Sequence, residues 1–569
     1  FAVARRRETL ATLRALGLTC SQMMLLLLGE AFFIGAAGAL VGLLLGWGLG
    51  TQLVALVART MSDLYFASEV VSIALERQTL IRALVLGAAS SILCAAWPAW
   101  RASRTIPHVG QQGRAQENSI RLLVPWMALA GCIALAGGFA LTGVGDAAST
   151  RGFWLGYLAL FLAIFGCGLL VPVVVSMLLS SRWVQRIAQR HPVANMSVRG
   201  VSAGLATTSV AVVAFMIALA TTVGVSVMVD SFRGSVESWL AGSLRATYYV
   251  NAGAANALER IDETTVQAIE SIAGVEHVSR ALWTVVNGKN ENVRLLALVP
   301  SPQSFSAFEL LQSVGPSGYS RFARGDGILV SEPFAFRHGL ALESTVRLRS
   351  NQGPVNVPVI GVFRDYRSEA GFVVMARPAF NAYWDVPGYT GLGVYAHGGR
   401  ASSQLRAALD AHLPARALVR ESAALREQSI RIFDRTFAVT RVLRWLTGVV
   451  AFVAVIGALL ALELTRSRDR AVLRALGMTR IEVLVAVEFE ALIHGALAGA
   501  LALPVGWVLS WFLVEIINQR SFGWSMSLTF DPALIPQTIL TGVIAAGCAG
   551  VYPAWRAAQS YPGSALRAE

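Results

Sequence analysis

The chain has few charged residues and almost no lysine. Charged side chains make up 14% of its 569 residues, compared with about a quarter in an average soluble domain. Of the 47 basic residues, all except Lys289 are arginine. Hydrophobic residues make up 55% of the chain and the mean hydropathy is +0.57. This composition excludes an ordinary soluble protein and indicates a membrane protein.

Several signatures of catalysis and metal binding are also missing. No G-x-x-x-x-G-K-[ST] sequence occurs, so the chain is not expected to hydrolyse ATP. The seven histidines never fall in H-E-x-x-H spacing, and the G-x-S-x-G match at residues 200–204 precedes an apolar run instead of joining a strand to a helix. The cysteines lie in or beside apolar runs and provide neither a disulfide framework nor zinc spacing: Cys20, Cys94, Cys132, Cys167 and Cys548. We therefore expect no catalytic residue, no metal site and no cofactor in this chain.

Eight apolar runs are long enough to cross roughly 30 Å of hydrocarbon at about 1.5 Å per residue. They lie near residues 22–50, 81–99, 122–144, 153–179, 205–229, 441–464, 482–516 and 533–552. Arginines cluster at alternate ends of these runs, and the positive-inside rule assigns those ends to the cytoplasm. The long segment 230–438 and the loops at 51–80, 145–152 and 517–532 then lie outside. Because the arginines follow membrane boundaries instead of forming one face, we expect no nucleic-acid partner.

One sequence unit occurs twice. Leu-Arg-Ala-Leu-Gly stands at residues 13–17 and again at 473–477, each time between a basic cluster and a long apolar run. The same offset of 460 positions pairs Glu30 with Glu490, and an offset of 455 pairs Pro-Ala-Trp-Arg at 98–101 with 553–556. The chain is therefore predicted to contain two related halves with a segment inserted between them.

Each copy begins with a basic amphipathic segment. Leucines recur at helical spacing through residues 5–17, which predicts a short helix on the cytoplasmic membrane surface. Gly17 then allows the chain to turn into the bilayer. A span ending at Leu464 precedes the second copy, so residues 1–4 are expected to be the tail of a span whose beginning is missing.

Small residues form a stripe in the span that follows each turn. A stripe kept in both copies predicts close helix packing, either between the halves or with a partner permease. The alternative is that glycine and alanine are simply frequent in this chain. The stripes are Gly38, Gly42, Gly46 and Gly50 in the first copy, and Ala498, Ala502, Gly506 and Ser510 in the second.

Glu30 and Glu490 occupy equivalent positions about a dozen residues beyond the turn. Ionisable groups within a membrane are functional candidates, because leaving one unpaired in lipid costs several kcal/mol. Their early place in each span favours an interfacial position, bonded to the turn or to an arginine, over a role in proton coupling.

The outside segment has the composition of a soluble α+β domain. One β-α-β pattern is expected over residues 246–278 and another over 393–420, with β-strands and a hairpin at 328–363 between them. Residues 421–440 are expected to form a helical stalk leading into the next span. The predicted organisation is a first permease repeat at 1–117, a connector with two transmembrane helices and a cytoplasmic loop at 118–200, a transmembrane helix at 201–230, the outside domain at 231–438, and a second repeat at 439–569.

The basic segment with Leu-Arg-Ala-Leu-Gly, the Glu-containing glycine-rich span and the closing Pro-Ala-Trp-Arg-Ala resemble the FtsX-type permease domain of the MacB and Lol class of ABC transporters. Both copies match, and with the connector they resemble the ten-span YbbP-like and BceB-like permeases. The order of elements in the outside domain is similar to that of the MacB periplasmic domain. The expected fold is thus an α-helical polytopic membrane protein with two FtsX-like permease repeats and an inserted α+β, MacB-like periplasmic domain.

The resemblance implies an ABC permease subunit of the bacterial inner (cytoplasmic) membrane that works by mechanotransmission. A separate cytosolic ABC ATPase, in two copies, would supply ATP and Mg, and its closing would move the periplasmic domain to export or extract a hydrophobic, lipidated or peptide substrate. Membrane lipid and a periplasmic protein or lipoprotein are the other expected partners. The implied ATPase-coupling residues are Arg5, Arg6, Arg7, Glu8, Leu13, Arg14, Gly17, Arg468, Asp469, Leu473, Arg474 and Gly477.

The second coupling segment departs from the family pattern. Glu8 stands where the family has an acidic residue, but its repeat position is Arg468, and Asp469 is displaced by one. Two other functions stay open. The first is a BceB-like permease that senses or detoxifies antimicrobial peptides and signals to a kinase. The second is an ion-coupled secondary transporter with Glu30 and Glu490 as proton carriers.

Overall fold

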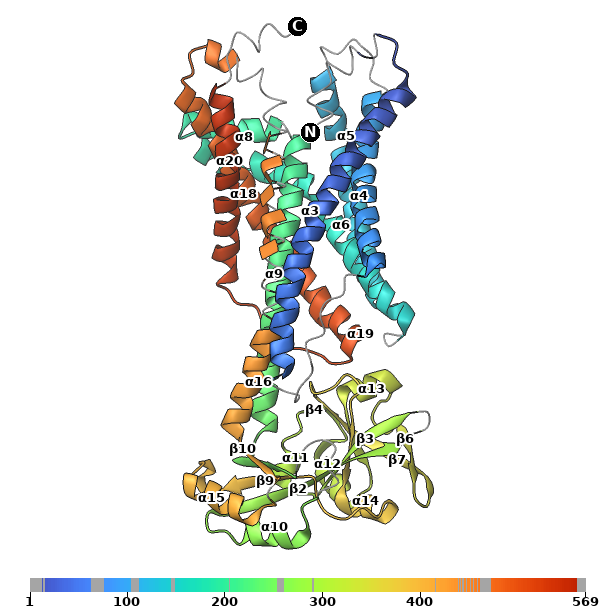
Figure 1. The fold of residues 1–569 in the computed structure, drawn as a ribbon. Coiled ribbons are helices and arrows are strands. Elements are labelled where there is room, and N and C mark those ends of the chain that lie inside the picture. The colour runs from blue at the N-terminus through green and yellow to red at the C-terminus, as the bar shows by residue number, and fades with distance from the viewer. Residues whose placement is uncertain are drawn as a thin grey trace.

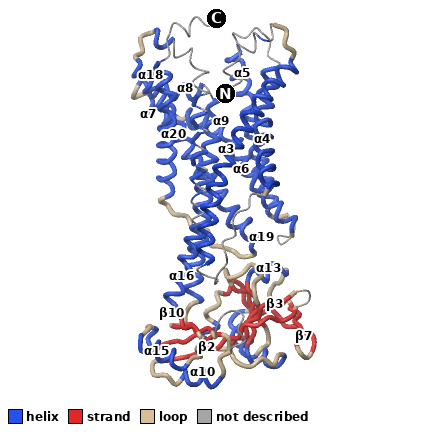
Figure 2. The backbone as a smooth tube through the Cα atoms, in the orientation of Figure 1, coloured by secondary structure: helices blue, strands red, loops and turns tan. Residues whose placement is uncertain are grey.

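The computed structural model describes residues 16–62, 76–103, 112–144, 149–203, 205–252, 260–288, 291–414, 416–437 and 472–559, with Leu13 and scattered residues between 440 and 460. A bundle of long helices occupies one end of the molecule and a mixed domain the other, and all the strands lie in that domain (Figures 1 and 2). Seven described helices are long and apolar enough to cross a membrane, and they match seven of the eight predicted runs. The eighth run, 441–464, is only partly covered by the described residues.

The long helices follow the predicted runs but extend beyond several of them. They are α3 (Cys20–Ser62), α4 (Arg77–Ser103), α5 (Gln112–Thr142), α6 (Thr150–Ser180), α9 (Leu205–Ser243), α18 (Arg480–Trp511) and α20 (Leu534–Gln559). Two short helices, α7 (Arg182–Ala188) and α8 (Pro192–Ala203), connect α6 to α9. After α18 the chain continues through the π-helical turns of η3 (Phe512–Asn518) and through α19 (Gln519–Phe522).

The two copies of the repeat cross their helices at equivalent glycines. A Cβ atom on Gly35 of α3 would lie 2.5 Å from the Cβ atom of Ser91 on α4. A Cβ atom on Gly495 of α18 would lie 2.5 Å from the carbonyl oxygen of Gly542 on α20. Real Cβ contacts this short do not occur, so both helix pairs depend on glycine for their close approach. The repeat in the sequence is therefore also a repeat in helix packing.

Alanine substitution at two glycines of the repeats should have opposite effects. We expect Gly495→Ala to lower the free energy of unfolding by about 1–3 kcal/mol, because the new methyl group overpacks a helix crossing. Gly38→Ala is the matched control, since no described atom lies within 4 Å of its Cβ position. It should stabilise α3 by up to about 1 kcal/mol. Thermal unfolding of both variants, followed by circular dichroism, tests this. Equal midpoints would contradict the packing assignment.

The outside domain contains one ten-stranded mixed sheet, with strand order β10-β1-β9-β2-β3-β8-β5-β7-β4 and β6 paired to β2 and β7. The strands are β1 (Tyr248–Asn251), β2 (Val275–Asn287), β3 (Asn292–Leu298), β4 (Leu310–Ser313), β5 (Ile328–Ser331), β6 (Thr345–Ser350), β7 (Gly353–Phe363), β8 (Val373–Ala376), β9 (Gly391–Ala396) and β10 (Leu418–Glu421).

The two predicted β-α-β units are interlocked in the first part of this sheet. Strand β9 lies between β1 and β2 and is antiparallel to both, while β1 lies between β10 and β9. Helix α10 (Glu263–Glu270) joins β1 to β2, and α15 (Ser403–His412), preceded by the 3-10 turn η2 (His397–Gly399), joins β9 to β10. This is the split β-α-β arrangement of ferredoxin-like domains. Both helices bury their apolar residues in a common core with the sheet.

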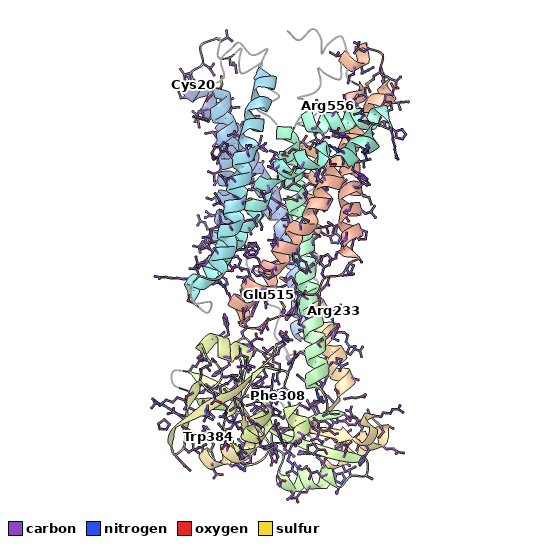
Figure 3. The ribbon with its side chains drawn as sticks, turned by 180° about the vertical axis from the view of Figure 1, so that it is seen from behind. Cys20, Arg233, Phe308, Trp384, Glu515 and Arg556 are labelled. Atoms are coloured by element: carbon purple, nitrogen blue, oxygen red, sulfur yellow. The ribbon has the colours of Figure 1, made fainter. Side chains whose placement is uncertain are left out.

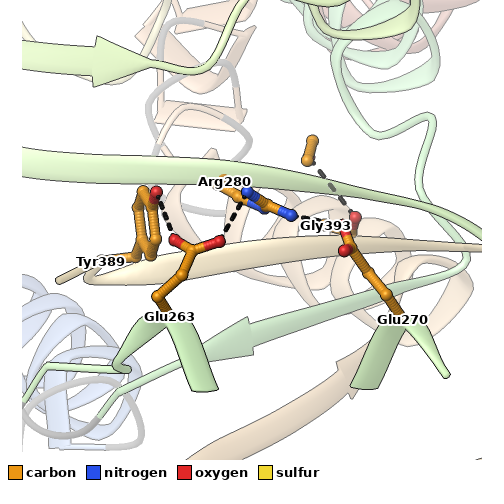
Figure 4. A network of polar contacts seen from close by, with 6 residues as sticks. Glu263, Glu270, Arg280, Tyr389 and Gly393 are labelled. Carbon is orange, nitrogen blue, oxygen red and sulfur yellow. Dashed lines mark hydrogen bonds and ion pairs between the residues drawn. The ribbon is translucent and has the colours of Figure 1, made fainter. Parts of the chain in front are cut away.

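An arginine ties α10 to the sheet (Figure 4). Nη1 of Arg280 on β2 lies 2.8 Å from a carboxylate oxygen of Glu263, and Nη2 lies 2.7 Å from one of Glu270. The hydroxyl of Tyr389 donates to the other oxygen of Glu263 at 2.9 Å. Because one guanidinium bridges both ends of α10, these bonds orient the helix on the sheet.

The second part of the sheet carries the inserted elements. Its short helices are α11 (Pro302–Phe305), η1 (Gly315–Ser317), α12 (Gly318–Arg324), α13 (Glu332–His338) and α14 (Arg377–Tyr383). The predicted strands at 328–363 correspond to β5, β6 and β7, whereas β3, β4 and β8 were not predicted. Strand β8 is buried along its whole length, and a short continuous apolar run of this kind lacks the alternation that identifies a strand.

Candidate functional site

Two helices, not one, connect the bundle to the outside domain. The sequence predicted that the span before this domain ends near residue 230, but α9 continues without a break to Ser243. Helix α16 (Ser422–Thr436), the predicted stalk, packs beside its outer end (Figure 1). A guanidinium nitrogen of Arg233 lies 2.8 Å from a carboxylate oxygen of Asp434, which joins the two helices. We call this pair of helices the stalk.

Aromatic side chains meet where the stalk, the bundle and the outside domain come together. Phe232 of α9 lies parallel to Trp524 with ring centroids 6.2 Å apart, and its ring is edge-on to Tyr366 at 5.9 Å. Phe433 and Phe437 contact Phe232 from the α16 side, at 5.2 and 5.6 Å. We call these five residues the junction cluster. Tyr366 belongs to the outside domain and Trp524 to the second repeat, so the cluster joins all three parts of the molecule.

The segment between α19 and α20 is bonded directly to the stalk. The hydroxyl of Ser231 accepts from the backbone N–H of Thr529 at 3.0 Å, and that of Ser235 accepts from the N–H of Ser527 at 3.0 Å. The hydroxyl of Tyr366 donates to the carbonyl of Ser525 at 2.8 Å. These bonds hold residues 523–530 against both α9 and the outside domain.

A π-helical turn leads from α18 to the junction cluster. The side-chain N–H of Asn518, the last residue of η3, donates to the carbonyl of Trp524 at 2.8 Å. The indole N–H of Trp524 donates to the side-chain oxygen of Asn518 at 3.3 Å. Asn518 is buried, so the pair of bonds fixes the position of the indole. Turns of this kind often occur at functional positions. Figure 3 labels Glu515 of η3 and Arg233 of α9 at this level of the molecule.

The repeated Leu-Arg-Ala-Leu-Gly ends in the same backbone turn in both copies. Gly17 has a φ of 103° and Gly477 a φ of 107°, in the left-handed region that favours glycine. The following backbone N–H donates to the carbonyl of Leu13 at 3.2 Å in the first copy, and to that of Leu473 at 3.1 Å in the second. This six-to-one bond is a Schellman helix ending. The leucine before each glycine is exposed, with Leu16 at 76% and Leu476 at 79%.

A helix start follows each turn, and the sequence reasoning missed it. Thr479 and Glu482 form a capping box at the first turn of α18. In the first copy the backbone N–H of Thr19 donates to the side-chain oxygen of Gln22 at 3.0 Å. The hydroxyl of Thr19 accepts from the backbone N–H of Gln22 at 3.4 Å. The signal was present as T-x-x-[EQ] directly before an apolar run. Each predicted coupling segment is therefore joined to its span by a glycine turn and a capped helix start.

Those of the predicted coupling residues that the structure describes lie at the end of the bundle that is farthest from the outside domain. Figure 3 labels Cys20 and Arg556 at that end and Trp384 at the other. A guanidinium nitrogen of Arg474 donates to the carbonyl of Ala558 at 3.2 Å, which ties the second segment to the end of α20. Leu13 and Leu473 are half-buried. Arg5, Arg6, Arg7, Glu8, Arg14, Arg468 and Asp469 lie outside the described residues.

The two small-residue stripes have different surroundings. Ala498, Ala502 and Ser510 are fully buried, and a Cβ atom on Gly506 would lie 2.7 Å from the side chain of Val223 on α9. The second stripe thus packs inside the chain, with α9 against it. Among the described atoms nothing lies within 4 Å of the Cβ positions of the first stripe, at Gly38, Gly42, Gly46 and Gly50.

The intramembrane carboxylates also differ between the copies. Glu490 is 8% exposed, and a ring nitrogen of His494 lies 2.5 Å from its backbone carbonyl oxygen. Glu30 is half-buried on α3, with no histidine at the corresponding position. Among the residues that the structure describes, no group of three or more His, Cys, Asp or Glu side chains is placed to hold a metal ion.

A buried carboxylate lies beside the junction cluster. Asp365 is fully buried and accepts from Nε of Arg367 at 2.8 Å. Burial raises the pKa of this carboxyl above its ordinary value, although the positive charge of Arg367 acts in the opposite direction. The guanidinium of Arg367 also lies 4.6 Å from the ring centroid of Phe372. The pair therefore fixes the loop that carries Tyr366.

Asp365 should make the stability of the outside domain depend on pH. Because its pKa is raised in the folded chain, its contribution to the free energy of unfolding is fully present below its ordinary pKa of 3.8. That contribution falls as pH rises through the raised value. We expect Asp365→Asn to reduce the loss of thermal stability between about pH 4 and pH 7. Melting curves at both pH values test this, and an unchanged difference would contradict it.

Comparison with known proteins agrees with this architecture. Residues 1–107 and 442–562 match the FtsX-like permease C-terminal family, and residues 208–412 match the MacB-like periplasmic core domain. An uncharacterized ABC transporter permease of Mycobacterium tuberculosis is 31% identical over 587 residues, covering 100% of this chain and 67% of that protein.

Two solved structures also match the chain at low overall similarity. The periplasmic region of MacB from Actinobacillus actinomycetemcomitans is 14% identical, covering 34% of this chain and 95% of that one, with a TM-score of 0.27. The extracellular domain of the noncanonic ABC-type transporter YknZ from Gram-positive bacteria is 12% identical. The match covers 31% of this chain and 100% of that domain, with a TM-score of 0.24.

The family matches confirm the predicted fold class of two FtsX-like repeats around an inserted MacB-like domain. With the apolar helices, they identify a multi-pass inner-membrane protein whose large domain is periplasmic. The chain belongs to the FtsX-like family of ABC transporter permeases and carries a MacB-like periplasmic core domain between its two permease repeats.

Proposed function

We propose that this permease transmits movement from a separate cytosolic ATPase to its periplasmic domain, and so exports or extracts a hydrophobic, lipidated or peptide substrate. The two exposed turns, at Leu16-Gly17 and Leu476-Gly477, are the docking points. Two such points in one chain fit two ATPase copies. The ATPase would bind ATP and Mg, and this chain would contribute no catalytic residue.

One observation carries the proposal, and it is the continuous path from the second docking turn to the periplasmic domain. The path runs from Gly477 through the capping box into α18 and η3, and then through the bonds between Asn518 and Trp524. Trp524 contacts Phe232 of the stalk and Tyr366 of the periplasmic domain. Each step is a packed or hydrogen-bonded contact, so a displacement of α18 would move the base of the periplasmic domain.

The geometry of the stalk supports transmission outside the membrane over transport through a pore. Helix α9 is one unbroken helix of 39 residues from the cytoplasmic side into the periplasmic domain. At about 1.5 Å per residue such a helix spans nearly 60 Å, which exceeds the roughly 30 Å of hydrocarbon. A rigid helix of this length passes movement to the domain at its far end.

Reconstitution into proteoliposomes tests this function against the ion-coupled alternative. The chain is purified with its ATPase, and substrate movement is measured with ATP alone and with a proton gradient alone. We expect movement with ATP only, together with a higher ATPase rate in the presence of the chain. Movement driven by the proton gradient without the ATPase would overturn the proposal.

A further inference from the structure

A cavity of about 840 Å³ lies between the stalk and the periplasmic sheet. The ends of both stalk helices form one wall of it, through Trp239 and Leu240 of α9 and Leu425 of α16. Trp283 of β2 and Phe308, the residue labelled within the periplasmic domain in Figure 3, also line it. Its volume falls in the range of about 300–1,000 Å³ that is typical of small-molecule sites.

The floor of the cavity is the uncovered face of the interlocked β-α-β sheet. Side chains alternate between the two faces of a strand. Along β1, Tyr248 belongs to the core beneath α10 and α15, whereas Tyr249 and Asn251 line the cavity. On β9, Val394 belongs to the core and Tyr395 lines the cavity. Val250 and Leu392 belong to the core and also border the cavity. In the described part of the domain, α10 and α15 cover one face of the sheet, and the cavity lies on the other face.

Among the residues that the structure describes, the charged side chains of the lining are all positive. They are four arginines, with no described Asp or Glu beside them: Arg260, Arg364, Arg367 and Arg420. Glu309 and Asp365, which lie outside the lining, pair with Arg364 and Arg367. Arg260 and Arg420 donate to neutral acceptors, the carbonyl of Pro387 at 3.0 Å and the amide oxygen of Gln428 at 3.5 Å. Among the described residues, neither of these two forms an ion pair.

One buried donor in the lining lacks an acceptor. Nε of Arg364 is inaccessible to solvent and has no hydrogen-bond partner among the described residues, although Nη1 of the same side chain lies 2.7 Å from Glu309. Leaving a buried donor unsatisfied is costly, and such groups in a native structure often indicate an absent ligand or ion. Arginine is the side chain best suited to bind phosphate and carboxylate oxygens.

We propose that this cavity binds an anionic lipid, whose phosphate or carboxylate lies among the arginines and whose acyl chain packs on the aromatic and aliphatic wall. The assignment is carried by the contrast between the apolar wall and the four arginines, of which Arg260 and Arg420 form no ion pair among the described residues. That this lipid is the transported substrate rests on the proposed function. That the cavity binds the lipid does not depend on that function. Because both stalk helices form part of the wall, movement of the stalk would change the shape of the cavity.

Calorimetric titration of the full chain in nanodiscs of zwitterionic lipid tests the assignment. The probe is dioctanoyl phosphatidic acid, and dioctanoylglycerol and inorganic phosphate are its neutral and headgroup-only counterparts. Empty nanodiscs provide the correction for partition into lipid. We expect saturable binding of the acid that is at least about 10-fold tighter than that of either counterpart, because both halves of the cavity contribute.

Three variants connect the binding to the cavity. The double variant Arg260→Gln, Arg420→Gln should weaken binding on the order of 10- to 100-fold, because charge-assisted hydrogen bonds are lost. Ala307→Trp should abolish binding by filling the space. Arg347→Gln is the matched control, since Arg347 is exposed on β6 and does not line the cavity. Circular dichroism of each variant establishes that it is folded.

The outcomes separate this inference from the proposed function. Equal affinity for dioctanoylglycerol, or equal weakening by Arg347→Gln, overturns the anionic lipid site even if the ATPase still drives transport. Binding that is lost in the cavity variants alone supports the site, even if the chain fails to stimulate an ATPase.

Discussion

Replacing Leu16 and Leu476 together by aspartate is expected to abolish capture of the ATPase. Both leucines are more than three-quarters exposed at the tip of a glycine turn, where a soluble partner can bury them. Burial of one leucine contributes about 1.5–3 kcal/mol, so binding of an ATPase copy at each turn should weaken by about 10- to 100-fold. Co-purification with the ATPase and the stimulated rate of ATP hydrolysis measure the effect.

A matched control separates docking from a general effect of added charge. Val285 is also an exposed hydrophobic residue, but it lies on β2 in the periplasmic domain. Val285→Asp should leave ATPase binding unchanged. Each single leucine variant should retain one ATPase, which the mass of the purified complex detects. If the double variant binds the ATPase normally, the docking assignment is wrong.

Replacing Trp524 by alanine is expected to uncouple ATP hydrolysis from transport. Its indole joins the second repeat to Phe232 of the stalk and Tyr366 of the periplasmic domain, and it is 8% exposed. Truncating a buried tryptophan costs about 3–5 kcal/mol, here at the point where movement is transmitted. We expect transport to fall at least about 10-fold while the ATPase stays bound and active, because the docking turns are intact.

Two conservative variants keep this prediction testable if Trp524→Ala is unstable. Trp524→Phe keeps an aromatic ring beside Phe232 but loses the indole bond to Asn518. Tyr366→Phe keeps its ring and loses the hydroxyl that donates to the carbonyl of Ser525. Both should fold and show partial uncoupling. Normal transport in all three variants would exclude the junction cluster as the transmission point.

The predictions that succeeded rest on local patterns. Apolar length identified seven of the described spans, and turn residues with alternation identified both β-α-β units. The sequence predicted that the chain turns at Gly17, and in the structure both Gly17 and Gly477 have the positive φ that glycine adopts without strain. The capping boxes at Thr19 and Thr479 follow an equally local rule, so they could have been predicted from the sequence alone.

The predictions that fell short needed knowledge of distant neighbours. The end of α9 was placed too early, because its outer turns carry charge and are stabilised by contact with α16. The two stripes have similar sequences but unlike surroundings, and only the fold reveals which one packs against α9. Strand β8 was missed because full burial removes the alternation of polar and apolar residues.

The sequence by itself determined the duplicated helices, their orientation in the membrane and the glycine turns that end each Leu-Arg-Ala-Leu-Gly. These features depend on periodicity, charge placement and backbone sterics, which act between residues close in the chain. The tertiary structure alone decided the interlocking of the two β-α-β units, the junction cluster and the arginine-lined cavity. Phe232, Tyr366 and Trp524 are separated by more than a hundred positions each, and contacts over such distances arise only when the fold brings their helices and loops together.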